Sequence, residues 1–351
     1  MAKLGVSLYS YQFECFRGIL SLEDCLAHAA SIGARGIEMV PEQTLTDLEY
    51  ETIDEGLVAR WKDWMSRYGL VPTNMNLYDD FDVYPNRTQT DDERYARFKH
   101  GVLLAKAMGF TSVRGSSEMP ARLLERCLRI AECHGIVVSV EIHAPFSLKS
   151  SYTQEWFELI DRTGTAYAGI HPDCGIFSKG PAACRIDQAV RRGAKRAVID
   201  YLQAAYAEAS AKRQAEATVL DLGDYRDVVA YGMAQPFEKA RAMGGTALEE
   251  GLFRRLTYDD PSWLVEYKRY IKHFHGKFYD MMPDGKGGFH DPSVDVEGAM
   301  SGLRRAGYQG WISSEYEGAG AYRDLACPVD GPDSRGLVEK HQKLMAGALA
   351  G

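Results

Sequence analysis

The 351-residue sequence lacks several features that would place it in a specialised class of protein. Its seven cysteines include no Cys-x-x-Cys pair, so neither a zinc ribbon nor a disulfide framework is indicated. The N-terminal segment also lacks the apolar core of a signal peptide, and we therefore expect reduced thiols and a cytoplasmic location. No apolar run reaches the roughly 18–20 residues that a spanning helix needs, so we expect no membrane association.

An excess of positive charge is also missing. Lysine and arginine together number 41 against 49 aspartates and glutamates, and the formal net charge is −8. A chain of this sign gains little from contact with phosphate backbones, so we expect no nucleic-acid partner. The first strand-like run is not followed by Gly-x-Gly-x-x-Gly, which disfavours a dinucleotide-binding fold.

The sequence does contain a regular alternation of short apolar runs and amphipathic helical stretches. The apolar runs predict strands at 4–10, 36–40, 71–76, 112–116, 137–144, 168–174, 271–278 and 310–318. Strands that alternate with helices predict a parallel sheet with crossover helices. Eight such units in a chain of this length predict an α/β fold of the (β/α)8 type, a TIM barrel.

The alternation breaks once, between the sixth and seventh strands. Residues 178–258 are predicted to form a long, mainly helical insertion, whose first half carries one apolar stripe over 186–205. We expect residues 1–351 to form a single barrel domain that includes this insertion. The insertion is expected to cover the mouth of the site or to dock another chain. A helix that merely packs on its own barrel is the alternative.

Ionisable residues gather at the carboxyl ends of the last four strands. Glu141 and His143 end the fifth strand, while Asp173, His275 and Glu315 lie near the ends of the next three. Because the carboxyl ends of barrel strands meet at one mouth, we expect these side chains to converge. Carboxylates and an imidazole suit Mn²⁺, Mg²⁺, Co²⁺ or Zn²⁺. The sequence therefore predicts one divalent metal, with Mn²⁺ the first expectation, held by Glu141, Asp173, His275 and Glu315.

Each of these residues taken singly has a structural alternative. A lone strand-end carboxylate is more often a solvated charge or a helix cap, but four on consecutive strand ends are harder to explain in this way. His171 and His273 are interpreted as packed or hydrogen-bonded histidines, not ligands. Cys174 and Cys327 are interpreted as packing residues.

The order of the four predicted ligands resembles the xylose-isomerase-like barrel superfamily, which includes sugar isomerases, ketose 3-epimerases, inosose dehydratases and endonuclease IV. The 32-residue interval from Glu141 to Asp173 and the 40-residue interval from His275 to Glu315 are similar to those of the family. The segment "HFH" also matches the family's His-x-His-x-Lys strand. The resemblance implies the same metal ligands. An endonuclease is disfavoured by the acidic charge and by too few histidines for a three-metal site.

Two departures weaken the resemblance to ketose 3-epimerases. Those enzymes carry a second histidine three residues after the metal aspartate, and Ile176 occupies that position here. The interval of 102 residues between Asp173 and His275 is also several times too long. The "VEIHAP" histidine, the insertion and the "ISSEYEG" ending are instead similar to the alpha subunits of bacterial C-glycoside deglycosidases. This resemblance implies a carbon–carbon lyase that pairs with a small β-sandwich beta subunit in a larger hetero-oligomer.

That family cleaves the bond between a 3-oxo-sugar and an aromatic aglycone, beginning with removal of a proton beside the carbonyl. We expect Glu141 to bind the metal while His143 stays free as the base, since its unperturbed pKa lies near neutrality. Loss of the C2 proton from a 3-oxo-glucoside would expel the aglycone from C1 and leave a 1,5-anhydro-3-keto sugar. Lys277 and Glu317 are expected to contact sugar hydroxyls.

Two other functions stay open at this point. One is a metal-dependent sugar isomerase or epimerase of the ketose 3-epimerase type, in which Glu315 takes the role of the base. The other is a metal-dependent sugar-binding or scaffold subunit without turnover, against which the spare base His143 argues.

Overall fold

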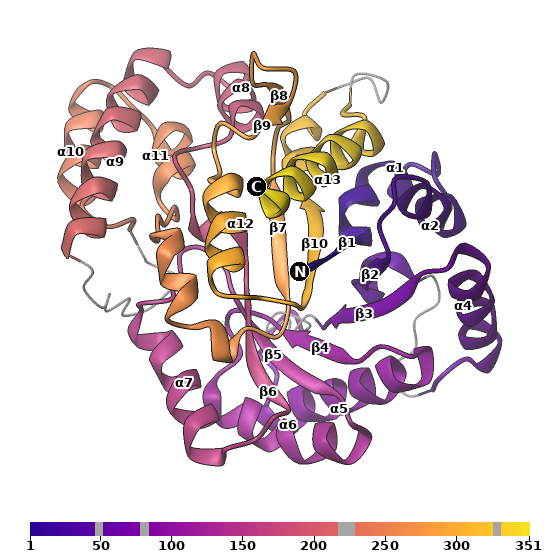
Figure 1. Ribbon diagram of the computed structural model, residues 1–351. Helices are drawn as coiled ribbons and strands as arrows, with labels where there is room; N and C mark the ends of the chain where they lie inside the picture. The colour runs from indigo at the N-terminus through magenta and orange to yellow at the C-terminus, as the bar shows by residue number, and fades with distance from the viewer. Residues whose placement is uncertain (46–51, 78–83, 217–228, 326–330) are drawn as a thin grey trace.

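The computed structural model (Figure 1) describes residues 1–45, 52–77, 84–216, 229–325 and 331–351. Cys327, interpreted above as a packing residue, lies outside these ranges. Eight strands build the main sheet, and two short ones form a hairpin. They are β1 Lys3–Ser7, β2 Gly36–Met39, β3 Val71–Asn76, β4 Ser112–Gly115, β5 Val137–Ile142, β6 Ala168–Pro172, β7 Phe274–Phe278, β8 Met282–Pro283, β9 Phe289–His290 and β10 Trp311–Tyr316.

All pairings in the main sheet are parallel, in the order β6-β5-β4-β3-β2-β1-β10-β7. Between β6 and β7 the sheet is joined by single bridges, Ile170 with Ile271 and Asp173 with His275. The result is a nearly closed barrel, which confirms the predicted TIM barrel. The bridge at this seam sets two of the predicted ligands side by side, although more than 100 residues separate them in sequence.

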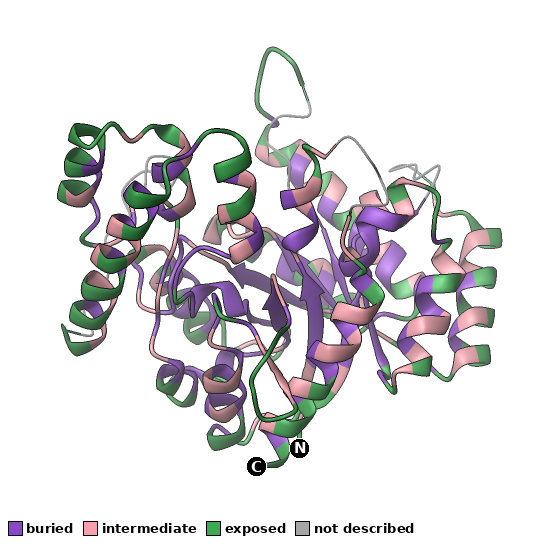
Figure 2. Ribbon diagram, turned by 90° about the horizontal axis from the view of Figure 1, so that it is seen from above, coloured by how far each residue is buried: buried purple, intermediate pink, exposed green. Residues whose placement is uncertain are grey.

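Helices surround the barrel, and their outer sides face solvent while the strands are buried at the centre (Figure 2). They are α1 Gln12–Phe16, α2 Leu22–Ser31, α3 Pro41–Thr44, α4 Glu55–Tyr68, α5 Asp91–Met108, α6 Ala121–His134, α7 Ser151–Thr163, α8 Ala183–Arg191, α9 Arg196–Glu216, α10 Ala234–Ala242, α11 Ala247–Phe253, α12 Val296–Arg305 and α13 Ser334–Ala350. Ser21 and Asp24 form a capping box at the start of α2. No described helix combines the length and the apolar character needed to cross a bilayer.

The insertion between β6 and β7 contains α8 to α11 within the described residues. One continuous helix over 186–205 was predicted, and this is wrong. The chain turns after α8 at Gly193, whose φ of 104° is open mainly to glycine, and then begins α9. Helices α9, α10 and α11 pack together at the left of the barrel in Figure 1 around their own apolar cluster, which includes Leu202, Tyr206, Phe237 and Phe253.

The predicted bounds of the first and seventh strands were too long. β1 ends at Ser7, and a 3₁₀ turn at Leu8–Tyr11 follows because Ser10 folds back on the eighth barrel strand. Its hydroxyl donates to the carbonyl of Ser314 and accepts from the backbone N–H of Tyr316. β7 begins only at Phe274. Neither change moves a predicted ligand away from the mouth of the barrel.

Candidate metal centre

The four predicted ligands lie together: Glu141, Asp173 and Glu315 at the carboxyl ends of β5, β6 and β10, and His275 near the start of β7. One potential ligand atom from each side chain lies within 4.8 Å of all the others. Around Nδ1 of His275, the nearest carboxylate oxygens are Oε1 of Glu141 at 3.0 Å, Oδ2 of Asp173 at 3.4 Å and Oε2 of Glu315 at 3.4 Å. We call Glu141, Asp173, His275 and Glu315 the ligand cluster.

Strand geometry explains why these residues converge. Glu141 and Glu315 are each the next-to-last residue of an inner strand, His275 is the second residue of β7, and Asp173 directly follows β6. Side chains alternate between the two faces of a strand, so each of these positions points into the barrel. All four residues are buried, and the most exposed, Glu141, reaches only 9%.

The donor set fits a divalent cation. The Oδ1 atom of Asp173 accepts a hydrogen bond from the backbone N–H of Gly175 at 2.6 Å, which fixes the orientation of the carboxylate. Its other oxygen, Oδ2, is buried without a hydrogen-bond partner among the described residues. Three buried carboxylates around one imidazole are costly unless a cation compensates them. Oxygen-rich ligands with one imidazole suit Mn²⁺ and similar ions.

Lys277 is a cationic side chain in contact with the cluster. Its Nζ lies 3.2 Å from Asp173 Oδ2, 3.7 Å from Glu315 Oε2 and 3.1 Å from Glu317 Oε2. Burial lowers the pKa of Lys277, but these carboxylates outweigh it and hold the pKa well above its usual value. The side chain therefore stays charged and neutralises part of the cluster.

The cluster's carboxylates differ in acidity. Burial raises the pKa of Glu141, but Arg114, which contacts it directly, and His275 bring the value down to about 2. Burial also raises the pKa of Asp173, but Lys277 and His275 outweigh it and hold this pKa far below the usual range. Burial raises the pKa of Glu315, and the negative charges of Asp173 and Glu141 raise it further, so that it reaches about 8 although His275 and Lys277 oppose the shift.

A further carboxylate, Glu38, supports the cluster from below. It is the third residue of β2, is fully buried, and places Oε1 2.6 Å from Nε2 of His275. Burial raises the pKa of Glu38, but His275 and His273 hold it well below the usual value. Our sequence analysis missed this residue. The available signal was an ionisable residue inside the apolar run "GIEMV", which only a charged or polar partner inside the barrel would explain.

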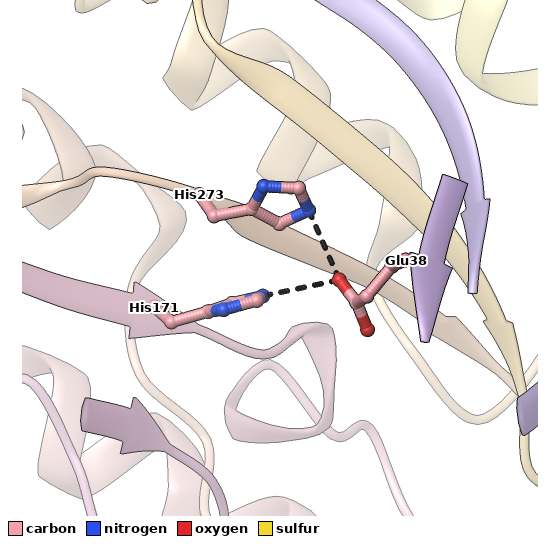
Figure 3. A group of neighbouring side chains, drawn as sticks. All are labelled: Glu38, His171 and His273. Carbon is pink, nitrogen blue, oxygen red and sulfur yellow. Dashed lines mark ion pairs between the residues drawn. The ribbon is translucent and has the colours of Figure 1, made fainter. Parts of the chain in front are cut away.

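His171 and His273 lie one layer deeper in the barrel and point toward Glu38 (Figure 3). Their Nε2 atoms are 3.9 Å and 3.0 Å from Oε2 of Glu38. His273 also bonds the hydroxyl of Ser313 at 2.8 Å, as a hydrogen-bonded histidine was expected to do. His171 is packed and not hydrogen-bonded: it is fully buried, its ring centroid lies 4.0 Å from that of His275, and neither of its nitrogens has a hydrogen-bond partner among the described residues. Burial lowers the pKa of His171 well below its usual value, so its ring is neutral.

His143 stands apart from the cluster, just after β5, and is partly exposed. Its Nδ1 lies 2.6 Å from the carbonyl oxygen of Ala144. A carbonyl can only accept a hydrogen bond, so Nδ1 carries a proton, and in the neutral imidazole the lone pair is then on Nε2. The ring borders a cavity of about 530 Å³, which we call the mouth cavity.

The mouth cavity lies between the barrel and the insertion. His143, Tyr279 and Glu317 line its barrel side, and residues of α8 and α11 line the opposite side. The hydroxyl of Tyr279 donates to Oε2 of Glu317 at 2.8 Å. Of the two residues expected to contact sugar hydroxyls, Glu317 lines the cavity and Lys277 lies behind it among the carboxylates. Cys174 packs in the barrel core, as interpreted from the sequence.

Comparison with known proteins agrees with this fold. Residues 26–217 match the model of the xylose isomerase-like TIM barrel family, and the chain belongs to that family. Over its full length it also matches an L-ribulose 3-epimerase structure with a TM-score of 0.54 and 16% identity, covering 100% of this chain and 95% of that one. At this identity the match shows the shared fold.

Curated relatives are similar over nearly the whole chain. The sequence is 26% identical to a C-glycoside deglycosidase alpha subunit from Arthrobacter globiformis, over 99% of this chain and 92% of that protein. It is 25% identical to a 3'-dehydrocarminate deglycosidase alpha subunit from Microbacterium sp., over 91% of this chain and 89% of that protein. Both relatives are named as alpha subunits.

Proposed function

We propose that the protein is a metal-dependent carbon–carbon lyase that cleaves the C-glycosidic bond of 3-oxo-glucosides by elimination. The main observation in support of this proposal is the position of His143. Its Nδ1 is bonded to a backbone carbonyl, which leaves Nε2 available, and its ring lies on the wall of a ligand-sized cavity beside the ligand cluster. The names of the relatives support the same activity. The proposed products are an aromatic aglycone and a 1,5-anhydro-3-keto sugar.

The ligand cluster would hold one divalent metal, proposed to be Mn²⁺. When bound, such an ion stabilises negative charge that develops on a carbonyl oxygen. Lys277 keeps the neighbouring carboxylates partly neutralised, and Glu317 offers a carboxylate to sugar hydroxyls from the cavity wall. Glu38 holds the ring of His275 by its far nitrogen.

His143 is proposed to remove the proton from C2, next to the C3 carbonyl, through its free Nε2. The electron pair of the C2–H bond forms a C1–C2 double bond, and the pair of the C1–aglycone bond goes to the aglycone carbon. That carbon takes up one proton, so the overall reaction is an elimination without an oxidant or reductant. The hydrogen bond from Nδ1 to Ala144 keeps the imidazole in the tautomer that this step requires.

Epimerisation of a ketose is the second candidate, and one observation favours it. Glu141 and Glu315 come from different strands, β5 and β10, and both belong to the ligand cluster. Such a pair could act as base and acid on one carbon. Against it, Ile176 is fully buried in the position of the second epimerase histidine, and the mouth cavity is lined on one side by α8 and α11 of the insertion.

The test is incubation of the metal-loaded protein with 3-oxo forms of aromatic C- and O-glucosides. Mass spectrometry should detect the free aglycone and the anhydro-ketose, and in D₂O unreacted substrate should gain deuterium at C2. Ordinary glucosides without the 3-oxo group and free ketoses are the controls. Epimerised ketose without any release of aglycone would replace this proposal with the second candidate.

We also propose a partner, a small β-sandwich beta subunit that joins this chain in a hetero-oligomer. The support is the naming of both relatives as alpha subunits. Purification from the native host followed by native mass spectrometry should reveal a second, smaller polypeptide. A homogeneous species of this chain alone, fully active on 3-oxo-glucosides, would contradict the partner and leave the reaction standing.

A further inference from the structure

The wall of the mouth cavity that faces the insertion is rich in arginine. Arg185 and Arg192 come from α8 and its C-terminal end, and Arg255 follows α11. Arg185 is partly buried, with Nη2 3.5 Å from the backbone carbonyl of Glu317, whereas Arg192 and Arg255 are exposed. We call these residues the three cavity arginines. They place three guanidinium groups around a single cavity next to the candidate base.

The three cavity arginines lack carboxylate partners, whereas neighbouring arginines have them. Arg191 pairs with Asp324 at 2.9 Å, and Arg254 lies 3.3 Å from Glu250. Within the part of the chain that the structure describes, none of the cavity arginines forms an ion pair. In each of the sequence pairs Arg191–Arg192 and Arg254–Arg255, the first arginine therefore has a carboxylate partner and the second lines the cavity.

The remaining lining does not neutralise these charges. Glu317 is the one acidic residue among the described residues of the wall, and it is already engaged by Lys277 and Tyr279. Apart from Gln188, the helices on the insertion side contribute mainly apolar residues, including Ala189, Leu248, Leu252 and Leu256. An apolar wall with unpaired guanidinium groups suits a flat hydrophobic ligand that carries an anion. This local charge contrasts with the net charge of −8 for the whole chain.

We propose that the mouth cavity binds an aromatic aglycone that bears a carboxylate, held by Arg185, Arg192 and Arg255. The inference rests on the proposed function, because it places the sugar at the ligand cluster and the aglycone toward α8 and α11. The guanidinium fork matches the two oxygens of a carboxylate, and the neighbouring leucines offer apolar contacts to an aromatic ring. Acidic aromatic C-glycosides in their 3-oxo form are then the preferred substrate class.

The test is a binding experiment that does not require turnover. The His143→Ala protein is titrated by calorimetry with 2-naphthoate and, as the uncharged counterpart, with 2-naphthamide. The acid should bind at least tenfold more tightly, and the difference should shrink as salt is added. Arg185→Gln, Arg192→Gln and Arg255→Gln should each weaken binding of the acid severalfold and leave the amide unchanged. Arg196→Gln, on α9 in a surface pair with Asp200, is the matched control and should change neither.

Failure of this inference can be told apart from failure of the proposed function. Equal binding of acid and amide overturns the aglycone proposal, even if 3-oxo-glycosides are cleaved. Selective binding of the acid by a protein that cleaves no 3-oxo-glycoside would refute the deglycosidase and preserve the anion site. A third outcome would also overturn the aglycone proposal. In that outcome the acid and the amide bind the wild type equally, and a subunit that co-purifies with the wild type no longer co-purifies with the variant in which Arg185, Arg192 and Arg255 are all replaced by glutamine. The cavity arginines would then belong to a subunit interface.

Discussion

Oε1 of Glu38 lies 2.6 Å from Nε2 of His275, on the side of the imidazole opposite the three cluster carboxylates. A carboxylate held ionised can only accept, so Nε2 of His275 must carry a proton. Nδ1 is therefore the nitrogen whose lone pair can face a metal. Such a carboxylate–histidine pair fixes both the tautomer and the ring orientation of a metal ligand.

Replacing Glu38 should therefore weaken metal binding although Glu38 is not itself a proposed ligand. We expect Glu38→Ala to lower metal affinity by about 10–100-fold, the usual effect of losing such a supporting group. Glu38→Gln, whose amide oxygen can still accept, should retain more of the affinity. Competition with a fluorescent chelator measures both, and the visible spectrum of the Co²⁺ form reports the ligand geometry. Unchanged affinity in a folded Glu38→Ala protein would remove Glu38 from the metal site.

The ligand cluster itself predicts one equivalent of metal per chain. Purified protein should contain about one Mn²⁺ or similar ion by elemental analysis, and EDTA should abolish activity that added Mn²⁺ restores. Asp173→Ala and His275→Ala should each lose the metal, because each removes a ligand from a buried set of four. Full metal occupancy in both variants would end the assignment of these residues.

The ligand cluster could be predicted from sequence because strand ends carry a local signal. Glu141 and Glu315 stand out as charged residues in apolar runs, and parallel barrel strands bring such positions to one mouth. The order of strands then suffices to place them together. The exact bounds of the strands were harder to predict from the sequence. β1, for example, ends early at Ser7, and Ser10 forms hydrogen bonds to β10, which is distant in sequence.

The support beneath the cluster could not be predicted in the same way. Glu38 and His275 are 237 residues apart, and only closure of the barrel brings β2 and β7 to opposite sides of a shared interior. The turn at Gly193 was hidden because the apolar stripe continues across it. The role of the cavity arginines could not be predicted from the sequence either, because their lack of carboxylate partners depends on tertiary contacts and not on spacing in the sequence.

His143 should be separable from metal binding. His143→Ala is expected to keep its metal, because His143 lies outside the ligand cluster, and to lose about 10²–10⁴ of turnover as a general base. Exchange of the C2 proton with solvent deuterium should be lost in parallel. His143→Gln is a useful companion, since it retains a polar side chain without the basic nitrogen. Normal turnover in both variants would transfer the role of base to Glu315 and strengthen the epimerase alternative.

A pH effect on stability is expected at His341, which lies on α13 away from the mouth cavity. The ring is fully buried, stacks on Phe278 with ring centroids 4.1 Å apart, and bonds Ser314 Oγ at 2.8 Å. Burial lowers the pKa of His341 from 6.5 to about 3. Between these values the unfolded chain binds a proton at this residue that the folded chain does not bind.

Folding stability should therefore fall as the pH drops from about 6.5 toward 3, with a limiting contribution of about 1.4 kcal/mol per pH unit from this residue. Above pH 6.5 both states are neutral, and the contribution is constant. His341→Asn and His341→Phe both remove the titration but alter packing differently. Urea unfolding between pH 4.5 and 8 should show both variants destabilised at pH 8, yet with the same shallower loss toward acid. An acid slope equal to that of the wild type in both would show that other groups carry the pH dependence.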